Sequence, residues 1–201
     1  VYGRTEHHDT YSWLDIDNEK AFVDAVSYLA KMGHRDIGLL GGDLTLNHAY
    51  LRKQGFLAGL KVHGLEMRAD WIVDDVRNEM GAREAVEKLL ALDTPPTAIV
   101  CITDSIAIGA IHALQRAGLT VGRDMSVIGY DGQPIGAAIE PGLTTMSQPS
   151  REAGHEIARM LLKQAGSPNS EISQVLWEAT LTPRASAYPP AGKRPGIHKG
   201  G

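Results

Sequence analysis

The sequence predicts an α/β fold built on a doubly wound parallel sheet. Short apolar runs alternate with amphipathic helical patterns, and each strand–helix unit takes about 30 residues, as in βαβ folds. Polar residues follow two predicted strands at 103–104 and 130–131, and the carboxyl ends of parallel strands face the ligand crevice in such folds. The 201 residues, 43% hydrophobic and 22% charged, suffice for one large or two small globular domains.

The individual elements follow from apolar periodicity and from residues that start or stop helices. In the helix predicted at 19–32, apolar residues recur at helical spacing, Asp17 or Asn18 supplies the N-cap, and Gly33 ends the helix. Further helices are predicted at 50–63, 81–92, 105–115 and 151–165. Strands are predicted at 1–4, 13–16, 37–40, 71–73, 98–102, 127–129 and 173–179, and an extended crossover at 143–146. The stretch 189–201 is predicted to be a disordered tail.

Three residues are candidates for holding a ligand. Arg52 is predicted in the first helical turn, where a cation is unfavourable, so either an anionic or hydroxyl-rich partner holds it or it is a solvated surface residue. Asp104 is interpreted first as a helix cap and second as a binding residue. Asp131 is equally consistent with a turn role and a binding role.

Charge, cysteine content and motifs limit the function classes. The net charge of −4 argues against nucleic-acid binding by this segment, and no apolar run is long enough to span a membrane. The single cysteine, Cys101, lies in an apolar strand and weakly favours a reducing compartment. The run EHHD at 6–9 fits a solvated loop better than a metal site, and the serine motif G-x-S-x-G is absent. Binding without catalysis is therefore favoured over an enzyme that uses Asp104 and Asp131 as acid and base.

Several short motifs occur in a distinctive order along the chain. They are GHRDI at 33–37, R-x-x-G-F at 52–56, PPTAI at 95–99, D-x-x-A-x-G-A at 104–110, VIGYD at 127–131, PGLTT at 141–145 and RAS at 184–186. Together they resemble the effector-binding core of the lactose-repressor/galactose-repressor family of bacterial transcriptional regulators. The resemblance spans about residues 1–188 and rests on the order and spacing of the motifs, since no single motif is specific.

The resemblance implies a type I periplasmic-binding-protein-like fold, with two α/β subdomains joined by three crossovers around the effector. On that template the N-terminal subdomain is incomplete, and the family's DNA-binding helix-turn-helix is expected to precede Val1. The implied division is the end of the N-terminal subdomain at 1–17, the C-terminal effector-binding subdomain at 18–147, a return helix of the N-terminal subdomain at 148–172, and a final C-terminal-subdomain segment at 173–188.

The resemblance also implies site residues. Arg52 matches the family arginine that donates to the effector, Asp131 matches the aspartate that accepts from it, and Thr103 stands where many sugar-responsive members have Asn. Further expected effector contacts are Arg4, Leu46, His48, Val76 and Arg77. The family dimerises partly through the helix predicted here at 105–115, where Ile108 and His112 lie off the inward face and are expected at the interface.

We therefore expect a cytoplasmic, homodimeric sensor domain of a transcriptional repressor that is not an enzyme and needs no cofactor or metal. A mono- or oligosaccharide effector would shift the closure of the two subdomains and so control DNA binding through the preceding segment. One alternative is a periplasmic sugar-binding protein of an uptake system, which would carry an export signal and no helix-turn-helix. The second alternative is a carbohydrate-active enzyme.

Overall fold

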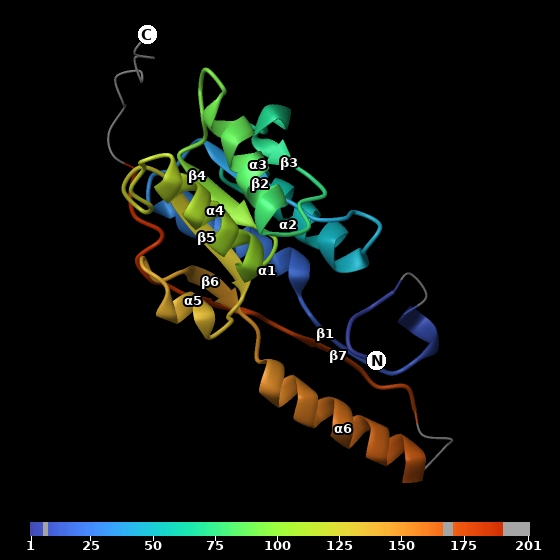
Figure 1. The fold of residues 1–201 in the computed structure, drawn as a ribbon. Coiled ribbons are helices and arrows are strands. Elements are labelled where there is room, and N and C mark those ends of the chain that lie inside the picture. The colour runs from blue at the N-terminus through green and yellow to red at the C-terminus, as the bar shows by residue number, and fades with distance from the viewer. Residues whose placement is uncertain (6–7, 167–170, 191–201) are drawn as a thin grey trace.

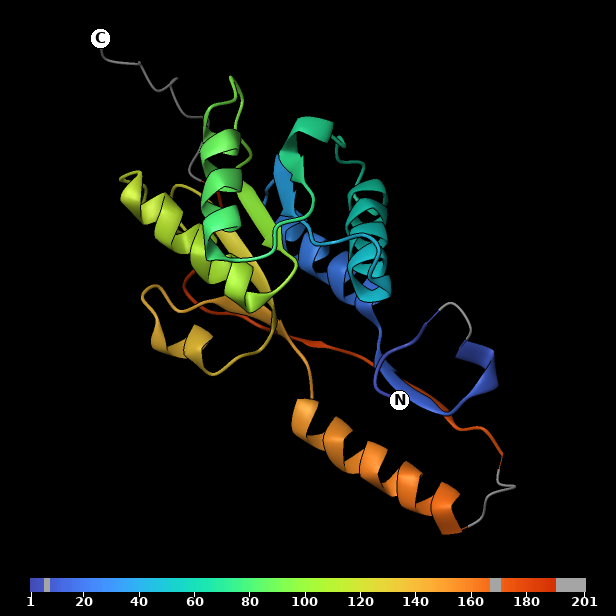
Figure 2. The same cartoon turned by 45° about the vertical axis from the view of Figure 1, so that its right-hand side comes forward.

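The chain forms two sheets of unequal size (Figures 1 and 2), and the computed structural model describes residues 1–5, 8–166 and 171–190. The strands are β1 Trp13–Ile16, β2 Ile37–Leu40, β3 Ile72–Val73, β4 Ala98–Cys101, β5 Ser126–Asp131, β6 Thr144–Ser147, β7 Gln174–Trp177 and β8 Thr180–Thr182. The larger sheet has the order β3-β2-β4-β5-β6-β8, with only β8 antiparallel to its neighbour, and the smaller sheet pairs β1 with β7 in parallel.

Helices cover both faces of the larger sheet, which confirms the doubly wound α/β prediction. The helices are α1 Asn18–Lys31, α2 Asn47–Val62, α3 Glu79–Leu90, α4 Asp104–Arg116, α5 Ile135–Ala138 and α6 Ser150–Gly166. Successive strand residues point to opposite faces, so Ala98 and Val100 of β4 join the core beneath α1 and α2, whereas Ile99 and Cys101 join the core beneath α3 and α4. With both faces buried, the central strands β2 and β4 are continuous apolar runs.

The smaller sheet carries α6 and stands apart from the larger one in both views. Leu14 of β1 packs with Ala153 and Met160 of α6 in a separate small core. The segment 173–188, which we expected to lie wholly in the C-terminal subdomain, is divided between the sheets. Its first strand, β7, pairs with β1, and only β8 joins β6.

Three short connections join the two sheets. Asp17 alone separates β1 from α1, residues 148–149 separate β6 from α6, and residues 178–179 separate β7 from β8. The side chain of Asp17 accepts a hydrogen bond from the backbone N–H of Lys20 at 2.9 Å and so caps α1. The three crossovers that the resemblance implied are therefore present.

All five predicted helices begin one to three residues earlier than predicted, and two of these starts bear on the candidate site. The second helix begins at Asn47 rather than at residue 50, and its N-cap, Leu46, makes no side-chain capping bond that a sequence pattern could reveal. Arg52 therefore lies in the second turn, and the argument from its first-turn position was wrong. Thr103, not Asp104, caps α4, because the Thr103 hydroxyl accepts from the Ile106 N–H at 3.3 Å.

Other elements lay outside the predictions or outside the described residues. The helix α5 and the strand β8 were not predicted, and a 3₁₀ turn at Ala69–Trp71 replaces the beginning of the strand expected at 71–73. Of the tail predicted at 189–201, residues 191–201 lie outside the described part of the chain, as do residues 6–7 of the run at 6–9.

Close packing of α1 against α2 gives a first prediction. A Cβ atom added at Gly55 of α2 would lie 2.1 Å from the backbone oxygen of Glu19, so Gly55→Ala must push the two helices apart. We expect it to lower the free energy of unfolding by at least about 1–3 kcal/mol in urea denaturation. The matched control, Gly154→Ala in α6, meets open space and should stabilise by about 0.5–1 kcal/mol. Equal effects of the two substitutions would contradict the packing argument.

Candidate effector-binding site

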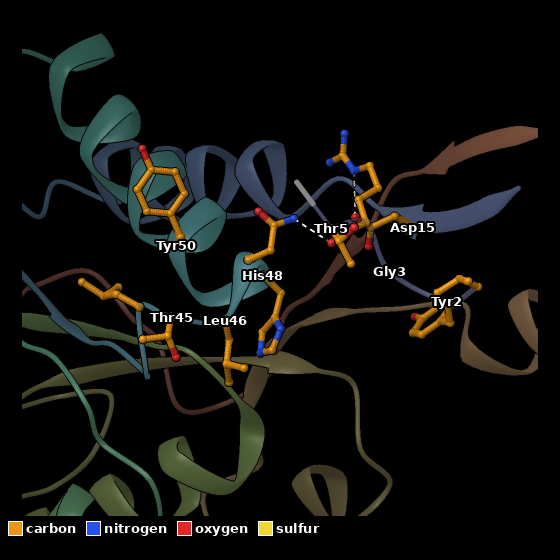
Figure 3. A pocket seen from close by; sticks show the side chains of 12 residues that line it. Tyr2, Gly3, Thr5, Asp15, Thr45, Leu46, His48 and Tyr50 are labelled. Atoms are coloured by element: carbon orange, nitrogen blue, oxygen red, sulfur yellow. Dashed lines mark hydrogen bonds and ion pairs between the residues drawn. The ribbon is translucent and has the colours of Figure 1, made fainter. Parts of the chain in front are cut away.

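A cavity of about 940 Å³ lies where the N-terminal segment and β1 meet the start of α2. Its walls are formed by Val1, Tyr2, Gly3, Arg4, Thr5, Asp15, Leu44, Thr45, Leu46, Asn47, His48 and Tyr50. Figure 3 shows Leu46 and His48 projecting from the start of α2, with Tyr2 and Asp15 on the other side. Of the predicted contact residues, Arg4, Leu46 and His48 line this cavity. The wall combines hydroxyl, amide, carboxylate and guanidinium groups with aromatic rings, as sites for small polar ligands do.

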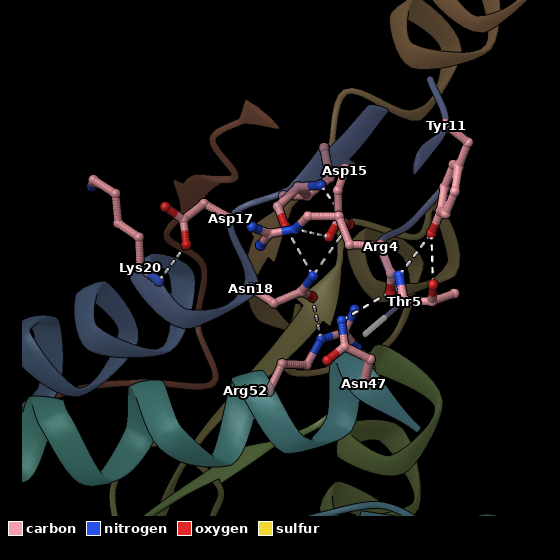
Figure 4. Close-up of polar contacts among 10 residues, drawn as sticks. Arg4, Thr5, Tyr11, Asp15, Asp17, Asn18, Lys20, Asn47 and Arg52 are labelled. Carbon is pink, nitrogen blue, oxygen red and sulfur yellow. Dashed lines mark hydrogen bonds and ion pairs between the residues drawn. The ribbon is translucent and has the colours of Figure 1, made fainter. Parts of the chain in front are cut away.

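A polar network connects this wall to the interior (Figure 4). The Arg4 Nε donates to Asp15 Oδ2 at 2.9 Å, and the Asn18 amide donates to Asp15 Oδ1 at 3.4 Å. The Arg52 Nε then donates to Asn18 Oδ1 at 2.8 Å. Asp15 and Asn18 are buried, so the two residues that link Arg4 to Arg52 are held in fixed positions.

Arg52 is a buried cation at the centre of the larger sheet's carboxyl edge. Its Nη1 donates to the backbone oxygen of Ile102 at 2.8 Å, and its Cζ lies 3.7 Å from the centroid of the Tyr130 ring, a cation–π arrangement. Burial lowers the pKa of Arg52 from its ordinary value, but a guanidinium keeps its charge in proteins. The surface-arginine interpretation of Arg52 is therefore wrong.

Asp131 ends β5 beside this cation. Its carboxylate accepts from the side-chain amides of Gln148 at 2.8 Å and Gln133 at 3.4 Å, and burial raises its pKa, although Arg52 opposes that rise. The two charged groups interact without forming an ion pair within 4.0 Å. The carboxylate and the guanidinium thus both keep donor or acceptor capacity for a further polar group.

The backbone around Asp131 is also unusual. Asp131 has φ of 128°, which an L-residue adopts at a cost of about 1–3 kcal/mol. The neighbouring Tyr130 hydroxyl is fully buried and makes no hydrogen bond of ordinary geometry among the described residues, although it interacts electrostatically with the Arg52 guanidinium. Strain and an unsatisfied polar group at one place are typical of a functional site rather than of an optimised core.

Asp104 has a structural role in this arrangement. It is fully buried, and its two oxygens accept from the Thr145 hydroxyl at 2.6 Å and the Gln133 backbone N–H at 2.7 Å. These bonds tie α4 to β6 and to the loop after β5. With no exposed surface, the Asp104 carboxyl is out of reach of a substrate on which it could act as an acid or base.

The remaining predicted residues lie elsewhere. Thr103 follows Ile102 directly but uses its hydroxyl to cap α4. Val76 is buried in the core beneath α3 and α4. Arg77 pairs with Asp75 at 2.7 Å and with Asp43 at 3.2 Å. None of these three residues lines the cavity described above. On α4, Ile108 packs partly against the core, and His112 Nδ1 lies 3.0 Å from Glu79 Oε1.

The sequence reasoning missed residues whose partners are distant in the chain. Tyr2, Asp15, Asn47 and Gln148 all belong to the site network, and Asn47 reaches back to the backbone oxygen of Arg4 at 2.9 Å. The one local signal was Asp15, an acid inside the buried apolar strand at 13–16. A buried acid in such a strand needs partners, and that need could have marked the site.

No group of three or more His, Cys, Asp or Glu side chains is arranged to hold a metal ion among the described residues. Within the same residues, no helix combines the length and apolar character that crossing a membrane requires.

Known proteins are similar to this chain over most of its length. The family described as "Periplasmic binding protein-like domain" matches residues 26–187. The chain is 36% identical over 174 residues to the HTH-type transcriptional repressor CytR of Escherichia coli K12, covering 86% of this chain and 51% of that protein. It is 34% identical over 162 residues to the HTH-type transcriptional repressor PurR of Pasteurella multocida, covering 81% of this chain and 48% of that protein. The chain thus spans about half the length of these curated relatives.

Solved structures agree with the sequence relatives. A complex of the transcriptional regulator CelR with cellobiose matches with a TM-score of 0.86 at 27% identity, covering 92% of this chain and 57% of that one. A LacI family regulator from Enterococcus faecium with bound ribose matches with a TM-score of 0.85 at 25% identity, covering 94% of this chain and 70% of that one.

The raised pKa of Asp131 gives a second prediction. Because the folded chain holds a proton on this carboxyl more tightly than the unfolded chain does, the ionised group destabilises the fold above its ordinary pKa of 3.8. We expect Asp131→Asn, which tolerates positive φ, to be more stable than wild type at pH 7, with a difference that shrinks as pH falls toward 4. Urea denaturation at several pH values measures this difference. A difference independent of pH would contradict the assignment.

Proposed function

Because the chain belongs to the periplasmic binding protein-like family of domains, we propose that it is the effector-binding part of a LacI-family transcriptional regulator. The curated relatives CytR and PurR are transcriptional repressors, and the structural neighbours include regulators bound to cellobiose and to ribose. These relatives favour a regulator over a periplasmic uptake protein. The full burial of Asp104 speaks against the enzyme alternative.

The observation that carries the proposal is the pair formed by Arg52 and Asp131. A buried guanidinium and a half-buried carboxylate lie beside each other at the carboxyl edge of the parallel sheet without an ion pair. A polyol offers hydroxyl groups that can accept from the guanidinium and donate to the carboxylate, so a sugar suits the pair. Further effector contacts in this proposal are Arg4, Leu46 and His48 from the cavity wall. Thr103, Val76 and Arg77, which do not line this cavity, stay predictions.

His48 fits such a neutral ligand. It lines the cavity wall with much of its surface exposed, and partial desolvation together with the nearby Arg52 charge lowers its pKa, which favours the neutral imidazole at physiological pH. A neutral imidazole both donates and accepts, which matches a hydroxyl group. The effector needs no charge of its own at this position.

The proposed mechanism is a population shift. An effector that binds more tightly to one angle between the two sheets favours that angle, and a homodimer passes the change to DNA-binding segments outside this chain. In this proposal the regulator acts in the cytoplasm, this chain contributes no DNA contact, and it needs no cofactor.

The third prediction tests the effector site. We expect at least one sugar or nucleoside in a panel containing ribose and cellobiose to raise the melting temperature of the complete protein, because a ligand at 100 times its Kd stabilises by about 2.7 kcal/mol. Asp131→Asn should remove this rise while the protein stays folded, since it removes the anionic acceptor. Differential scanning fluorimetry measures both.

Asp93→Asn is the matched control, because Asp93 is exposed between α3 and β4, at the opposite edge of the sheet. It should leave the ligand-induced rise unchanged. A full rise in Asp131→Asn would exclude Asp131 from the site, and turnover of any sugar would exclude a pure sensor.

The fourth prediction tests the dimer. The proposed interface includes Ile108 and His112 and borders a groove of about 440 Å³ between α3 and α4. Met80 lines this groove, and 70% of its surface is exposed. Met80→Glu should shift the complete protein from dimer to monomer in sedimentation velocity. Val62→Glu, equally exposed at the end of α2, should not. Dimers that persist in Met80→Glu at micromolar concentration would place the interface elsewhere.

A further inference from the structure

We propose that Tyr2 and Gln148 form a positioning relay for Asp131, in which the Tyr2 hydroxyl fixes the Gln148 amide and that amide fixes the Asp131 carboxylate. The inference deepens the proposed effector site and rests on it for its biological meaning. Its chemical content does not depend on which effector binds. Neither residue is a predicted effector contact.

The direction of the hydrogen bonds in this relay is set by chemistry. The Tyr2 hydroxyl donates to Gln148 Oε1 at 2.8 Å, and Gln148 Nε2 donates to Asp131 Oδ1 at 2.8 Å. An ionised carboxylate can only accept, so the Gln148 amide must turn its NH₂ group toward Asp131 and its oxygen toward Tyr2. The Tyr2 hydroxyl in turn has to donate. Each bond therefore enforces the orientation of the next.

The relay joins parts of the chain that belong to different sheets. Tyr2 forms a backbone bridge with Leu14 of β1, and it lines the cavity. Gln148 lies in the two-residue connection between β6 and α6, and Asp131 ends β5 in the larger sheet. A change in the angle between the sheets moves Tyr2 relative to Asp131, so the relay makes the carboxylate sensitive to that angle.

The groups around Asp131 show why this positioning matters. Burial and the neighbouring Asp104 on α4 favour the protonated form of Asp131, whereas Arg52 on α2 and the amides of Gln148 and Gln133 favour the ionised form. Of the two amide contacts, the one from Gln148 is shorter by 0.6 Å, from 3.4 to 2.8 Å. Of the two uncharged donors, Gln148 therefore stabilises the ionised Asp131 carboxylate and its orientation more strongly.

The fifth prediction tests the relay without any ligand or DNA. In the complete protein, we would titrate the Asp131 carboxyl by ¹³C NMR, with its signal identified by its loss in Asp131→Asn. Gln148→Leu should raise the Asp131 pKa by about half a unit or more, because the ionised form loses its best donor. Tyr2→Phe should raise it by a smaller amount, because the Gln148 amide is then free to turn.

The double variant Tyr2→Phe/Gln148→Leu distinguishes a relay from two separate effects. With Gln148 removed, Tyr2→Phe should add nothing, whereas independent contributions would add. Two variants serve as controls. Gln115→Leu removes an exposed amide that donates to the backbone oxygen of Glu140, and Tyr28→Phe removes a hydroxyl on α1. Both should leave the titration of Asp131 unchanged.

Two results would overturn the relay. An Asp131 pKa unchanged by Gln148→Leu would show that the amide does not support the carboxylate. A response to Gln148→Leu with none to Tyr2→Phe would leave Gln148 acting alone. Because no ligand enters the titration, a failure of the relay is separable from a failure of the proposed function, which the ligand panel tests.

Discussion

One buried cation constrains the arrangement of the larger sheet and its helices. The Arg52 guanidinium lies over the Tyr130 ring and donates to Asn18 at the start of α1 and to the carbonyl of Ile102 after β4. An arginine keeps its charge when buried, and stripping its partners leaves an uncompensated charge that costs about 3–5 kcal/mol. The positions of α1, β4 and β5 relative to α2 therefore depend on keeping this charge surrounded by acceptors and by an aromatic face.

Both charges of the site reach the cavity wall through a neutral amide. Arg52 connects to the wall residue Asp15 through Asn18, and Asp131 connects to the wall residue Tyr2 through Gln148. A carboxamide donates at one end and accepts at the other, so it links two polar groups without adding charge. The interior can thus hold one cation and one anion in fixed orientations while the wall stays available to a ligand.

The sequence revealed what local patterns encode and little that depends on distant contacts. The strand at 37–40 matched the prediction because an apolar run bounded by polar residues is a local signal. The start of α2 was missed because Leu46 caps it without a side-chain bond. Asn18 was interpreted only as a possible cap, since its bond to Arg52 joins residues 34 positions apart. Val76 was predicted as an effector contact but is buried in the core, because sequence spacing does not specify where a loop side chain points.

The short connections between the sheets also determine how the molecule can deform. At most two residues separate the elements at each of the three crossings, so the sheets can bend about this line far more easily than they can slide along it. The helix α6, with 17 residues, is about 25 Å long and extends away from the line in both views. A bend of about 10° at this line would therefore displace the far end of α6 by about 4 Å.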